Sequence, residues 1–375
     1  MKILLIASLA ESLINFRGPL ICAFQDRGME VHVVAPDMFQ QSHILQQLVI
    51  MGVTAHQVPM LRTGTNPMAD LRTTWALWRL ICQIQPTMVL AYTVKPVIYG
   101  TLAAWLAGVP KRFALITGLG YAFQGEGQRS ILRALVQRLY RLALVRSQLV
   151  FFQNPDDLAL FQKLGVLQPQ TLTCVVNGSG VSLDRFAAKP LSFETLTSTR
   201  FLFIGRLLGD KGVREYANAA RLLKRNYPHV QFALVGWIDT NPDAILPSEL
   251  EEWVDEGSIV YLGRLEDVRP AIEACSVYVL PSYREGMPRT VLEAMAIGRA
   301  IITTDAPGCR ETVIDGYNGF LIPIKDSDAL AQAMSRFIEQ PCLQINMGLC
   351  SHQIAEEKYD VNKVNALMLR RMGIT

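Results

Sequence analysis

Short apolar runs alternate with segments of helical periodicity along almost the whole chain, and this alternation limits the fold more than any other feature. Buried strands are predicted in the first half at 2–7, 30–35, 88–92, 112–116, 149–153 and 172–176, and in the second half at 200–204, 231–235, 258–261, 277–280, 300–303 and 319–322. Apolar strands separated by helices are typical of parallel sheets that helices cover on both faces. The sequence therefore predicts an α/β protein.

The length of 375 residues indicates two domains, because a single hydrophobic core rarely extends over so long a chain. A polar stretch without clear periodicity, 187–195, is interpreted as the linker. We expect two doubly wound, Rossmann-like domains that face a central cleft, at residues 1–187 and 198–350, with a C-terminal helix at about 355–375 packing back onto the first. Ligands of such sheets bind at the carboxyl ends of the strands.

The composition excludes several classes of protein. Half of the residues are hydrophobic and the net charge is only +3, which predicts a folded protein and gives no indication of nucleic-acid binding. The seven cysteines include no C-x-x-C pair and the five histidines form no cluster, so neither a disulfide framework nor a metal site is predicted. The apolar N-terminal run ends before Glu11 without a cleavage pattern, which favours a first strand over a signal peptide. No apolar stretch is long enough to span a membrane, and a cytoplasmic location is expected.

The segment 284–295, REGMPRTVLEAM, places two carboxylates across a predicted junction of loop and helix. A Gly-Met-Pro turn precedes the helix, so backbone N–H groups near Arg289 would open it with a positive dipole end that suits a diphosphate. Glu285, before the helix, is placed to accept hydrogen bonds from sugar hydroxyls, and Glu293, about two turns inside it, from ribose hydroxyls. The alternative is a plain helix start with two solvated glutamates.

Cationic side chains follow the first predicted strand of the second domain. Arg206 and Lys211 lie in a glycine-containing loop that leads to a helix expected from Val213. A guanidinium fork and a compact ammonium are what a leaving diphosphate requires where no metal supplies positive charge. The alternative is that both are solvated residues of an ordinary surface loop.

Other features of the second half have structural interpretations. The glycines at 236 and 263 follow predicted strands, where they would let the backbone approach a base or a ribose. Asp267 is predicted to cap the next helix. The Asp326-Ser327-Asp328 sequence has the form of a metal-binding motif, but an apolar helix follows it directly, and capping is the preferred interpretation.

These motifs together resemble the family 4 retaining glycosyltransferases with the GT-B fold, over essentially the whole chain. The motifs that carry the resemblance are Gly205-Arg206 with Lys211-Gly212, Leu234-Val235-Gly236, Glu285 with Glu293, and Asp315-Gly316-Tyr317-Asn318-Gly319. Motifs of the first domain are similar to the subgroup that extends polyprenyl-diphosphate-linked sugars in bacterial glycan assembly, nearest to the lipid-linked diacetylbacillosamine N-acetylgalactosaminyltransferase type. They are Asn15-Phe16-Arg17-Gly18-Pro19, Thr93-Val94-Lys95-Pro96, Ile116-Thr117-Gly118-Leu119-Gly120 and Gly178-Ser179-Gly180-Val181.

The resemblance implies a reaction and a donor site. The reaction is metal-independent transfer, with retention and without a cofactor, of an N-acetylhexosamine or hexose from a UDP-sugar to a lipid-linked or saccharide acceptor. The resemblance implies that Arg206 and Lys211 bind the diphosphate and that Glu285 binds the donor sugar, which makes these three the catalytic candidates. Glu293 would bind the ribose. The other donor-binding candidates are Gly205, Gly236, Arg264, Gly286, Met287 and Arg289.

The acceptor side is predicted at loops of the first domain. Asn15, Arg17, Thr93 and Lys95 follow predicted strands, where the cations would hold an acceptor diphosphate; Arg17 could instead brace its own helix. Many relatives place a His after the fourth strand of this domain, near the reacting sugar. This chain has Thr117 there, so the role of the His does not transfer and Thr117 is the candidate at that place.

The segment 129–144 predicts a basic amphipathic helix. Leucines recur at helical spacing, and Arg129, Arg133, Arg138 and Arg141 fall on the other side. Such a helix could lie on the inner face of the plasma membrane, or it could pack its leucines on the sheet and solvate its arginines. Both interpretations are open.

Two other classes of function share this architecture, because a fold does not determine a function. One is a nucleotide-sugar epimerase, which would convert its substrate without an acceptor. The other is a non-catalytic nucleotide- or glycan-binding protein.

Overall fold

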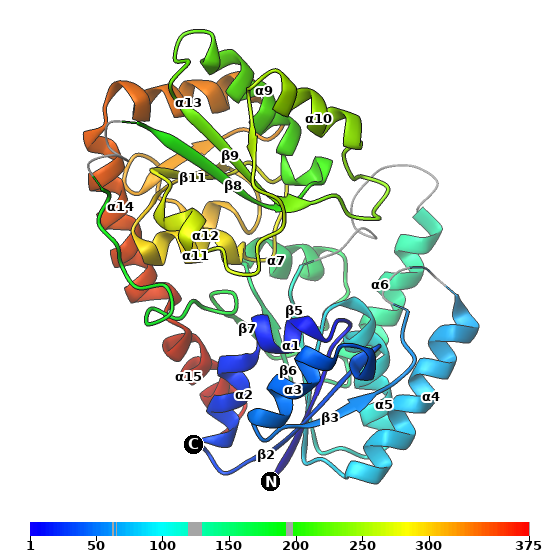
Figure 1. The fold of residues 1–375 in the computed structure, drawn as a ribbon. Coiled ribbons are helices and arrows are strands. Elements are labelled where there is room, and N and C mark those ends of the chain that lie inside the picture. Colours follow the sequence, from blue (N-terminus) through cyan, green and yellow to red (C-terminus); the bar gives the residue numbers. More distant parts are fainter. Residues whose placement is uncertain (62–63, 65, 119–129, 193–197, 375) are drawn as a thin grey trace. The chain divides into compact units, whose positions relative to one another are not determined.

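The computed structural model describes residues 1–61, 64, 66–118, 130–192 and 198–374 (Figure 1). The chain divides into two compact units: unit 1 comprises Met1–Ser179 and Val364–Thr375, and unit 2 comprises Gly180–Lys363. Each unit contains one parallel sheet, of seven strands in unit 1 and six in unit 2. The predicted α/β fold class with two Rossmann-like domains is confirmed.

Unit 1 is built on a sheet with the strand order β3-β2-β1-β4-β5-β6-β7. Its strands are β1 (Lys2–Ile6), β2 (Glu30–Ala35), β3 (Thr54–Gln57), β4 (Met88–Tyr92), β5 (Lys111–Ile116), β6 (Leu149–Phe152) and β7 (Thr173–Val175). The chain order reverses between β1 and β4, which is the point where doubly wound sheets bind ligands at their carboxyl ends. The sequence did not predict β3, because this edge strand is partly exposed and contains no apolar run.

Helices cover both faces of this sheet (Figure 1). One face is packed by α1 (Glu11–Asn15), α2 (Gly18–Gln25), α3 (Ser42–Ile50) and the C-terminal helix α15 (Val361–Arg371). The other face is packed by α4 (Pro67–Ile84), α5 (Thr101–Leu106), α6 (Ser130–Leu144) and α7 (Pro155–Lys163). The short α1 precedes α2, and Gly28, just after the end of α2, has φ +69°, where a glycine is favoured.

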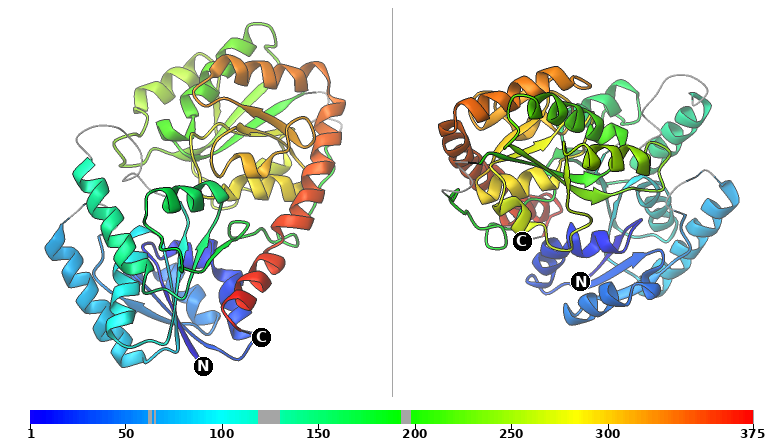
Figure 2. Two further views of the ribbon diagram at one scale, coloured as in Figure 1. Left: turned by 180° about the vertical axis from the view of Figure 1, so that it is seen from behind. Right: turned by 45° about the horizontal axis from the view of Figure 1, so that its top comes forward.

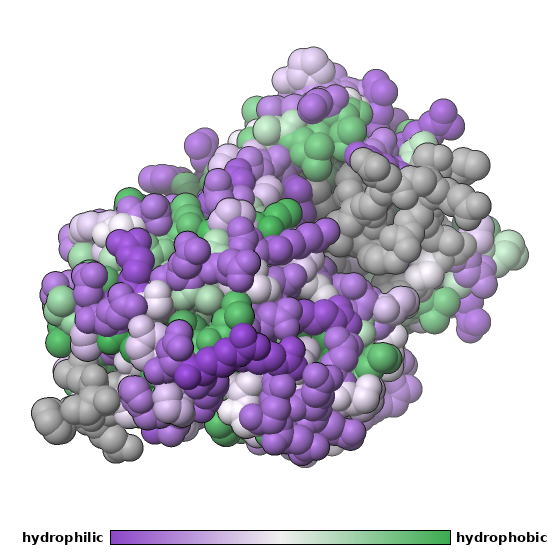
Figure 3. All heavy atoms as spheres, turned by 90° about the horizontal axis from the view of Figure 1, so that it is seen from above, coloured by the Kyte–Doolittle hydropathy of each residue, from purple (hydrophilic) through white to green (hydrophobic). Residues whose placement is uncertain are grey.

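Unit 2 has the strand order β10-β9-β8-β11-β12-β13. Its strands are β8 (Arg200–Arg206), β9 (Gln231–Trp237), β10 (Val260–Tyr261), β11 (Val277–Leu280), β12 (Ala300–Thr304) and β13 (Gly319–Ile322). Its helices are α9 (Val213–Lys224), α10 (Pro247–Asp255), α11 (Arg269–Glu273), α12 (Arg289–Ile297), α13 (Ser327–Glu339) and α14 (Cys342–Ile354). The face in Figure 3 is mostly hydrophilic, with hydrophobic residues in small groups.

Asparagine and aspartate side chains begin several helices. The Asn66 side chain accepts hydrogen bonds from the first turn of α4, and Asp326 Oδ1 accepts one from Ala329 N at 2.8 Å. The capping interpretation of the Asp326 motif is therefore confirmed. Asp267 Oδ1 accepts a hydrogen bond from Arg269 N, the first residue of α11, at 3.0 Å, so it too satisfies a backbone donor at a helix start.

A pair of histidines joins β2 to β3. His32 Nδ1 lies 3.0 Å from His56 Nε2, and the two rings stack with centroids 5.3 Å apart. Burial, followed by the charge of His32, lowers the pKa of His56 below its ordinary value of 6.5. The unfolded chain therefore takes up this proton at a higher pH than the folded chain does.

We expect the free energy of unfolding to fall as the pH is lowered from about 7.5 to about 5.5, because protonation of His56 favours the unfolded chain. Urea unfolding at several pH values measures the effect. The His56→Gln variant should lose less stability over the same range. An equal loss in the variant and the parent would show that other groups cause the pH dependence.

Candidate active site

The carboxyl end of β8 brings the predicted cations to the edge of the sheet in unit 2. The strand ends at Arg206, a short 3-10 turn spans Gly209–Lys211, and α9 begins at Val213. Gly212 has φ +71°, and a side chain there would collide with the carbonyl oxygen of Pro281. The turn that carries Lys211 is therefore held against the end of β11, and only glycine fits at its last position.

Lys211 and Glu285 form an ion pair. Lys211 Nζ lies 2.6 Å from Glu285 Oε1, and the exposed fractions of the two side chains are 15% and 17%. Ser282 Oγ also donates to Glu285 Oε1, at 2.8 Å. The structure thus brings together two catalytic candidates that are 74 positions apart in the sequence. Both residues are predicted site residues, but nothing in the sequence indicates that they pair.

The turn after β12 holds the backbone of Glu285. Glu285 N donates to Pro307 O at 2.9 Å, and a side chain at Gly308 would collide with the carbonyl oxygens of Glu285 and Gly286. Gly286 is buried, and Met287 packs against the hydrophobic core of unit 2. Backbone contacts on both sides therefore fix the loop that precedes α12.

The second predicted carboxylate lies inside α12, as the spacing predicted. The helix begins at Arg289, directly after Pro288, and Arg289 Nε donates to Glu293 Oε1 at 2.9 Å. Glu293 is only 7% exposed, and burial raises its pKa above the ordinary value. An acidic side chain buried beside one arginine is a costly arrangement, which is more typical of a binding site than of a solvated helix start.

Arg206 pairs with a carboxylate that the sequence analysis did not single out. Arg206 Nη1 lies 2.8 Å from Asp239 Oδ2. Across the sheet, Arg206 is the neighbour of Trp237 in β9, and the Arg264 guanidinium lies over the Trp237 ring at 4.7 Å. Asp239 was missed because nothing in its local sequence marks it, whereas the strand pairing places it beside Arg206.

Close backbone approach explains the glycines at the ends of these strands. Gly205 and Gly236 are paired between β8 and β9. A side chain at Gly236 would collide with the Gly205 carbonyl oxygen. The two glycines therefore keep the carboxyl edge open at the strands that carry Arg206 and Trp237.

The predicted acceptor residues lie in unit 1, at the carboxyl ends of β1, β4 and β5. Thr93 has φ +68°, and its Oγ1 donates to Ser8 Oγ at 2.8 Å, which joins the loops after β4 and β1 at the point where the strand order reverses. Asn15 is exposed at the end of α1, and Thr117 is half-buried after β5. The part of the family motif at Leu119-Gly120 lies outside the described residues.

The two predicted cations of the acceptor side both have partners within unit 1. Lys95 Nζ lies 2.7 Å from Asp70 Oδ1, with both side chains 12% exposed, and Tyr99 donates to the other oxygen of this carboxylate at 2.8 Å. Burial and then the Asp70 carboxylate raise the pKa of Tyr99. Arg17 is buried, with its guanidinium 5.1 Å from the centre of the Tyr92 ring. This contact joins Arg17 to β4 rather than to its own helix.

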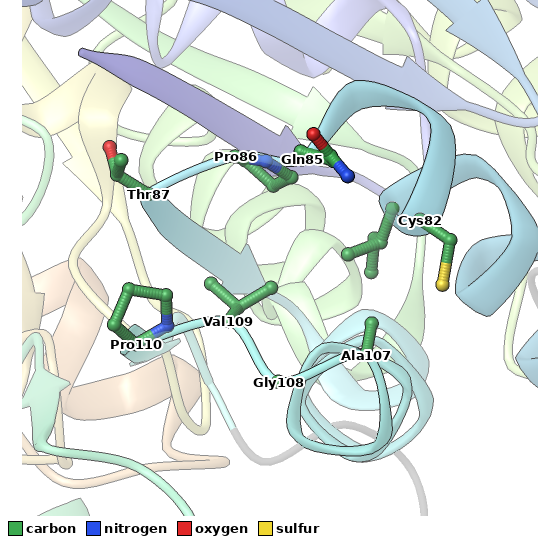
Figure 4. Close-up of a pocket in the computed structure, with 9 residues that line it drawn as sticks. Cys82, Gln85, Pro86, Thr87, Ala107, Gly108, Val109 and Pro110 are labelled. Atoms are coloured by element: carbon green, nitrogen blue, oxygen red, sulfur yellow. The ribbon is translucent and has the colours of Figure 1, made fainter.

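A pocket of about 380 Å³ in unit 1 lies away from these residues (Figure 4). It is lined by the C-terminal ends of α4 and α5 and by the residues just before β4 and β5, among them Gln85, Thr87 and Gly108. It therefore lies at the amino edge of the sheet, opposite the edge where doubly wound sheets bind their ligands.

Within the described parts of the chain, no group of three or more His, Cys, Asp or Glu side chains is placed to hold a metal ion. The same residues include no helix with the length and apolar character needed to cross a membrane.

Two family models match the chain. Residues 2–154 match the model described as glycosyl transferase 4-like, and residues 198–340 match the model described as glycosyl transferases group 1. The two matches fall on the two sheets described above.

Curated relatives extend over the same length. The chain is 30% identical over 373 residues to N,N'-diacetylbacillosaminyl-diphospho-undecaprenol alpha-1,3-N-acetylgalactosaminyltransferase of Campylobacter jejuni, covering 96% of each. It is 28% identical to UDP-Gal:alpha-D-GlcNAc-diphosphoundecaprenol alpha-1,3-galactosyltransferase of Escherichia coli, covering 84% of this chain and 83% of the relative.

Solved structures share the fold. HepE of Anabaena in complex with UDP superposes with a TM-score of 0.77 at 19% identity, covering all of both chains. Sucrose-phosphate synthase of Thermosynechococcus elongatus superposes with a TM-score of 0.80 at 19% identity, covering 99% of this chain and 98% of that one. The family that the sequence motifs predicted is confirmed by the full-length relative, by both family models and by the fold: this chain belongs to the family 4 glycosyltransferases with the GT-B fold.

Proposed function

We propose that this glycosyltransferase moves an N-acetylhexosamine or hexose from a UDP-sugar to a polyprenyl-diphosphate-linked saccharide, with retention at the anomeric carbon. The observation that carries the proposal is the Lys211–Glu285 pair close to the start of α12, where a cation and a carboxylate precede the N–H groups of a helix. The Campylobacter and Escherichia coli relatives, whose names specify diphospho-undecaprenol-linked acceptors, support the class of acceptor. The comparisons give no support to the epimerase or to the non-catalytic alternative.

In this proposal residues 198–350 bind the donor. Arg206 and Lys211 hold the diphosphate, Glu285 accepts hydrogen bonds from the sugar hydroxyls, and Glu293 accepts them from the ribose. Because both cations already pair with carboxylates, the incoming diphosphate would exchange places with Asp239 at Arg206 and share Lys211 with Glu285. The remaining donor-binding candidates are Gly205, Gly236, Arg264, Gly286, Met287 and Arg289.

The chemical step transfers the sugar on one face of its ring. The bond from the anomeric carbon to the diphosphate oxygen breaks, the acceptor oxygen bonds on the same face, and a donor phosphate oxygen takes the acceptor proton. The negative charge that develops on UDP is stabilised by Arg206, Lys211 and the positive end of α12, so the step requires no cofactor or metal ion.

Residues 1–187 hold the acceptor in this proposal, with Asn15, Arg17, Thr93, Lys95 and Thr117 at the carboxyl edge of the first sheet. Because the acceptor is carried on a lipid, the reaction would take place at a membrane surface. We therefore place the protein in the cytoplasm, with peripheral contact to the inner face of the plasma membrane through 129–144. Arg129 of that segment lies outside the described residues.

The test is a screen of UDP-sugars by calorimetry, followed by transfer to a lipid-diphosphate-linked N-acetylhexosamine. One UDP-sugar should bind and be consumed only when the acceptor is present. The anomeric coupling constant of the product, measured by NMR, should equal that of the donor. Consumption of the donor without acceptor would contradict the proposal, and an inverted product would contradict the retaining step.

Replacing Glu293 by glutamine is expected to weaken binding of the UDP-sugar about tenfold, because the amide preserves the volume but removes the anionic acceptor. Calorimetry with UDP-sugar measures the affinity, and the melting temperature monitors the fold. The matched control is Glu339→Gln, since this glutamate contacts Tyr227 on an exposed surface of the same unit. Equal affinities for the parent and the Glu293 variant would remove Glu293 from the donor site.

A further inference from the structure

Helices α4, α5 and α6 expose three tryptophans on the outside of unit 1. α5 packs against both α4 and α6, and the three helices lie side by side in Figures 1 and 2. Trp75 and Trp78 on α4 are 54% and 38% exposed, and Trp105 on α5 is 39% exposed. The chain has only five tryptophans, so most of them lie on this one layer of helices. Exposed indoles are not explained by the core of unit 1.

The outward stripe of α4 is apolar and cationic. Its inner stripe is buried and comprises Asp70, Thr73, Leu77, Ile81 and Ile84. Its outer stripe is exposed and comprises Met68, Leu71, Arg72, Trp75, Trp78 and Arg79. A surface helix normally presents charged and polar residues to water. The apolar and cationic outer side of α4 is instead typical of a helix that lies against a lipid bilayer or another apolar surface.

The chain around these helices has a strong excess of positive over negative side chains. Residues 66–118 and 130–155 contain nine Lys and Arg but one acidic residue, Asp70, which is buried and paired with Lys95. All other residues of the chain together contain 27 Lys and Arg against 32 Asp and Glu. The helical layer is therefore a cationic surface on a chain whose remainder is net acidic.

Only part of the apolar side predicted for α6 is exposed in the structure. Tyr140, Ala143 and Leu144 are buried against unit 1, so this part of the apolar stripe packs on the sheet. Leu135 and Leu142 remain 48% and 57% exposed, and Arg138 and Arg141 are exposed too. The outer side of α6 thus presents arginines with two leucines.

Arginine and indole also meet directly between the helices. The Arg146 guanidinium, just after α6, lies over the Trp105 ring at 4.2 Å. An arginine that follows α6 and a tryptophan of α5 are therefore in direct contact within this layer. We refer to Trp75, Trp78, Trp105, Arg138, Arg141 and Arg146 as the α4–α6 surface.

We propose that the α4–α6 surface is a docking surface for an anionic lipid bilayer, with the α4 tryptophans as its apolar anchors. Indoles favour the level of the lipid headgroups, where their rings meet acyl chains and their N–H groups meet water and phosphate. Arginines among them bind lipid phosphates, and the lack of exposed carboxylates on these helices removes repulsion. This inference rests on the proposed function, in which the acceptor is held in a bilayer. It places the main membrane anchors on α4 instead of on the predicted helix at 129–144.

Flotation with vesicles of phosphatidylcholine containing about 30 mol% phosphatidylglycerol tests the proposal. The full-length protein should float with these vesicles at low salt, bind pure phosphatidylcholine more weakly, and be released as the salt concentration rises. The Trp75→Ala/Trp78→Ala and the Arg138→Glu/Arg141→Glu variants should each bind at least about tenfold more weakly. The charge variant should also lose most of the salt dependence.

Matched variants on other surfaces control for general effects. Phe39→Ala/Ile50→Ala removes two side chains that are 59% and 85% exposed on the opposite helical layer of unit 1. Arg27→Glu/Arg225→Glu introduces the same charge change at two exposed arginines. Both controls should float as the parent does. If the parent does not bind anionic vesicles at low salt, or if the α4 variant binds as well as the controls, the proposal is wrong.

Two measurements separate this proposal from its alternatives. Sedimentation of the parent and the α4 variant tests for a second copy: a dimer that the tryptophan substitutions dissociate would assign the surface to self-association and overturn the proposal. Transfer to a short-chain, water-soluble acceptor should be equal in the parent and the α4 variant. An α4 variant that no longer binds vesicles but transfers sugar to the soluble acceptor as the parent does would support the docking surface. A parent protein that binds vesicles but transfers no sugar would contradict only the proposed function.

Discussion

Lys211→Met is expected to lower kcat about 10²- to 10³-fold, because it removes the positive charge that we assign to the leaving diphosphate. The methionine keeps an unbranched side chain of similar length, so the packing of the turn Gly209–Lys211 changes little. Single-turnover transfer with saturating UDP-sugar measures the chemical step. The melting temperature should fall only modestly, since the ion pair is partly exposed.

The partner of Lys211 provides a stricter form of this test. If Lys211 and Glu285 act on the donor as one unit, Lys211→Met/Glu285→Gln should be hardly slower than the slower single variant. The control is Arg221→Met in α9, the helix that follows Lys211. This substitution breaks the exposed pairs with Glu252 and Glu256 and should change kcat less than about twofold. Independent, additive effects of the two substitutions would contradict a shared role, and a fully active Lys211→Met enzyme would remove Lys211 from catalysis.

Arg299→Met is expected to destabilise unit 2 by about 3 kcal/mol. Arg299 is 1% exposed and donates to backbone carbonyl oxygens of several segments. The acceptors are Lys189 at 2.7 Å, Glu273 at 3.0 Å, Ile272 at 3.1 Å, and Ile297 and Gly298 at 3.3 Å each. Methionine fills part of the volume but leaves these carbonyls without their donor, and each buried carbonyl without a partner costs free energy.

Urea unfolding monitored by tryptophan fluorescence measures this loss. Arg299→Lys keeps the charge, but its single ammonium cannot reach acceptors spread around a planar fork, so it should recover only part of the stability. The exposed Arg225→Met is the control and should change the free energy of unfolding by less than about 0.5 kcal/mol. A loss below about 1 kcal/mol for Arg299→Met would show that water or neighbouring donors replace the guanidinium.

The strands and helices that carry the site could be predicted because their signals are local. β11 and β12 are short apolar runs, and α12 follows a proline with a repeating apolar face, so neighbouring residues suffice to recognise them. The positions of Glu285 and Glu293 relative to the start of α12 also follow from local sequence. β3 escaped prediction because an edge strand needs little apolar surface, and its pairing with β2 supplies what its residues do not indicate.

Which charges neutralise each other could not be read from the sequence. Lys95 pairs with Asp70, 25 positions away, and Arg206 pairs with Asp239, 33 positions away. Each pair joins residues from different elements, and the strand order decides which loops become neighbours. These cations could be proposed as site residues from the sequence, but the carboxylate that pairs with each of them could not.

The amino-acid sequence by itself determined the α/β class, the two parallel sheets, the family and the residue types that we propose for the donor site, because periodicity and short motifs act over a few neighbouring residues. Only the tertiary structure decided the pairing of Lys211 with Glu285, the burial of Arg299 and the exposure of the α4 tryptophans. These properties depend on which distant segments come into contact, and contact across a folded chain is set by the packing of whole sheets and helices rather than by any local stretch.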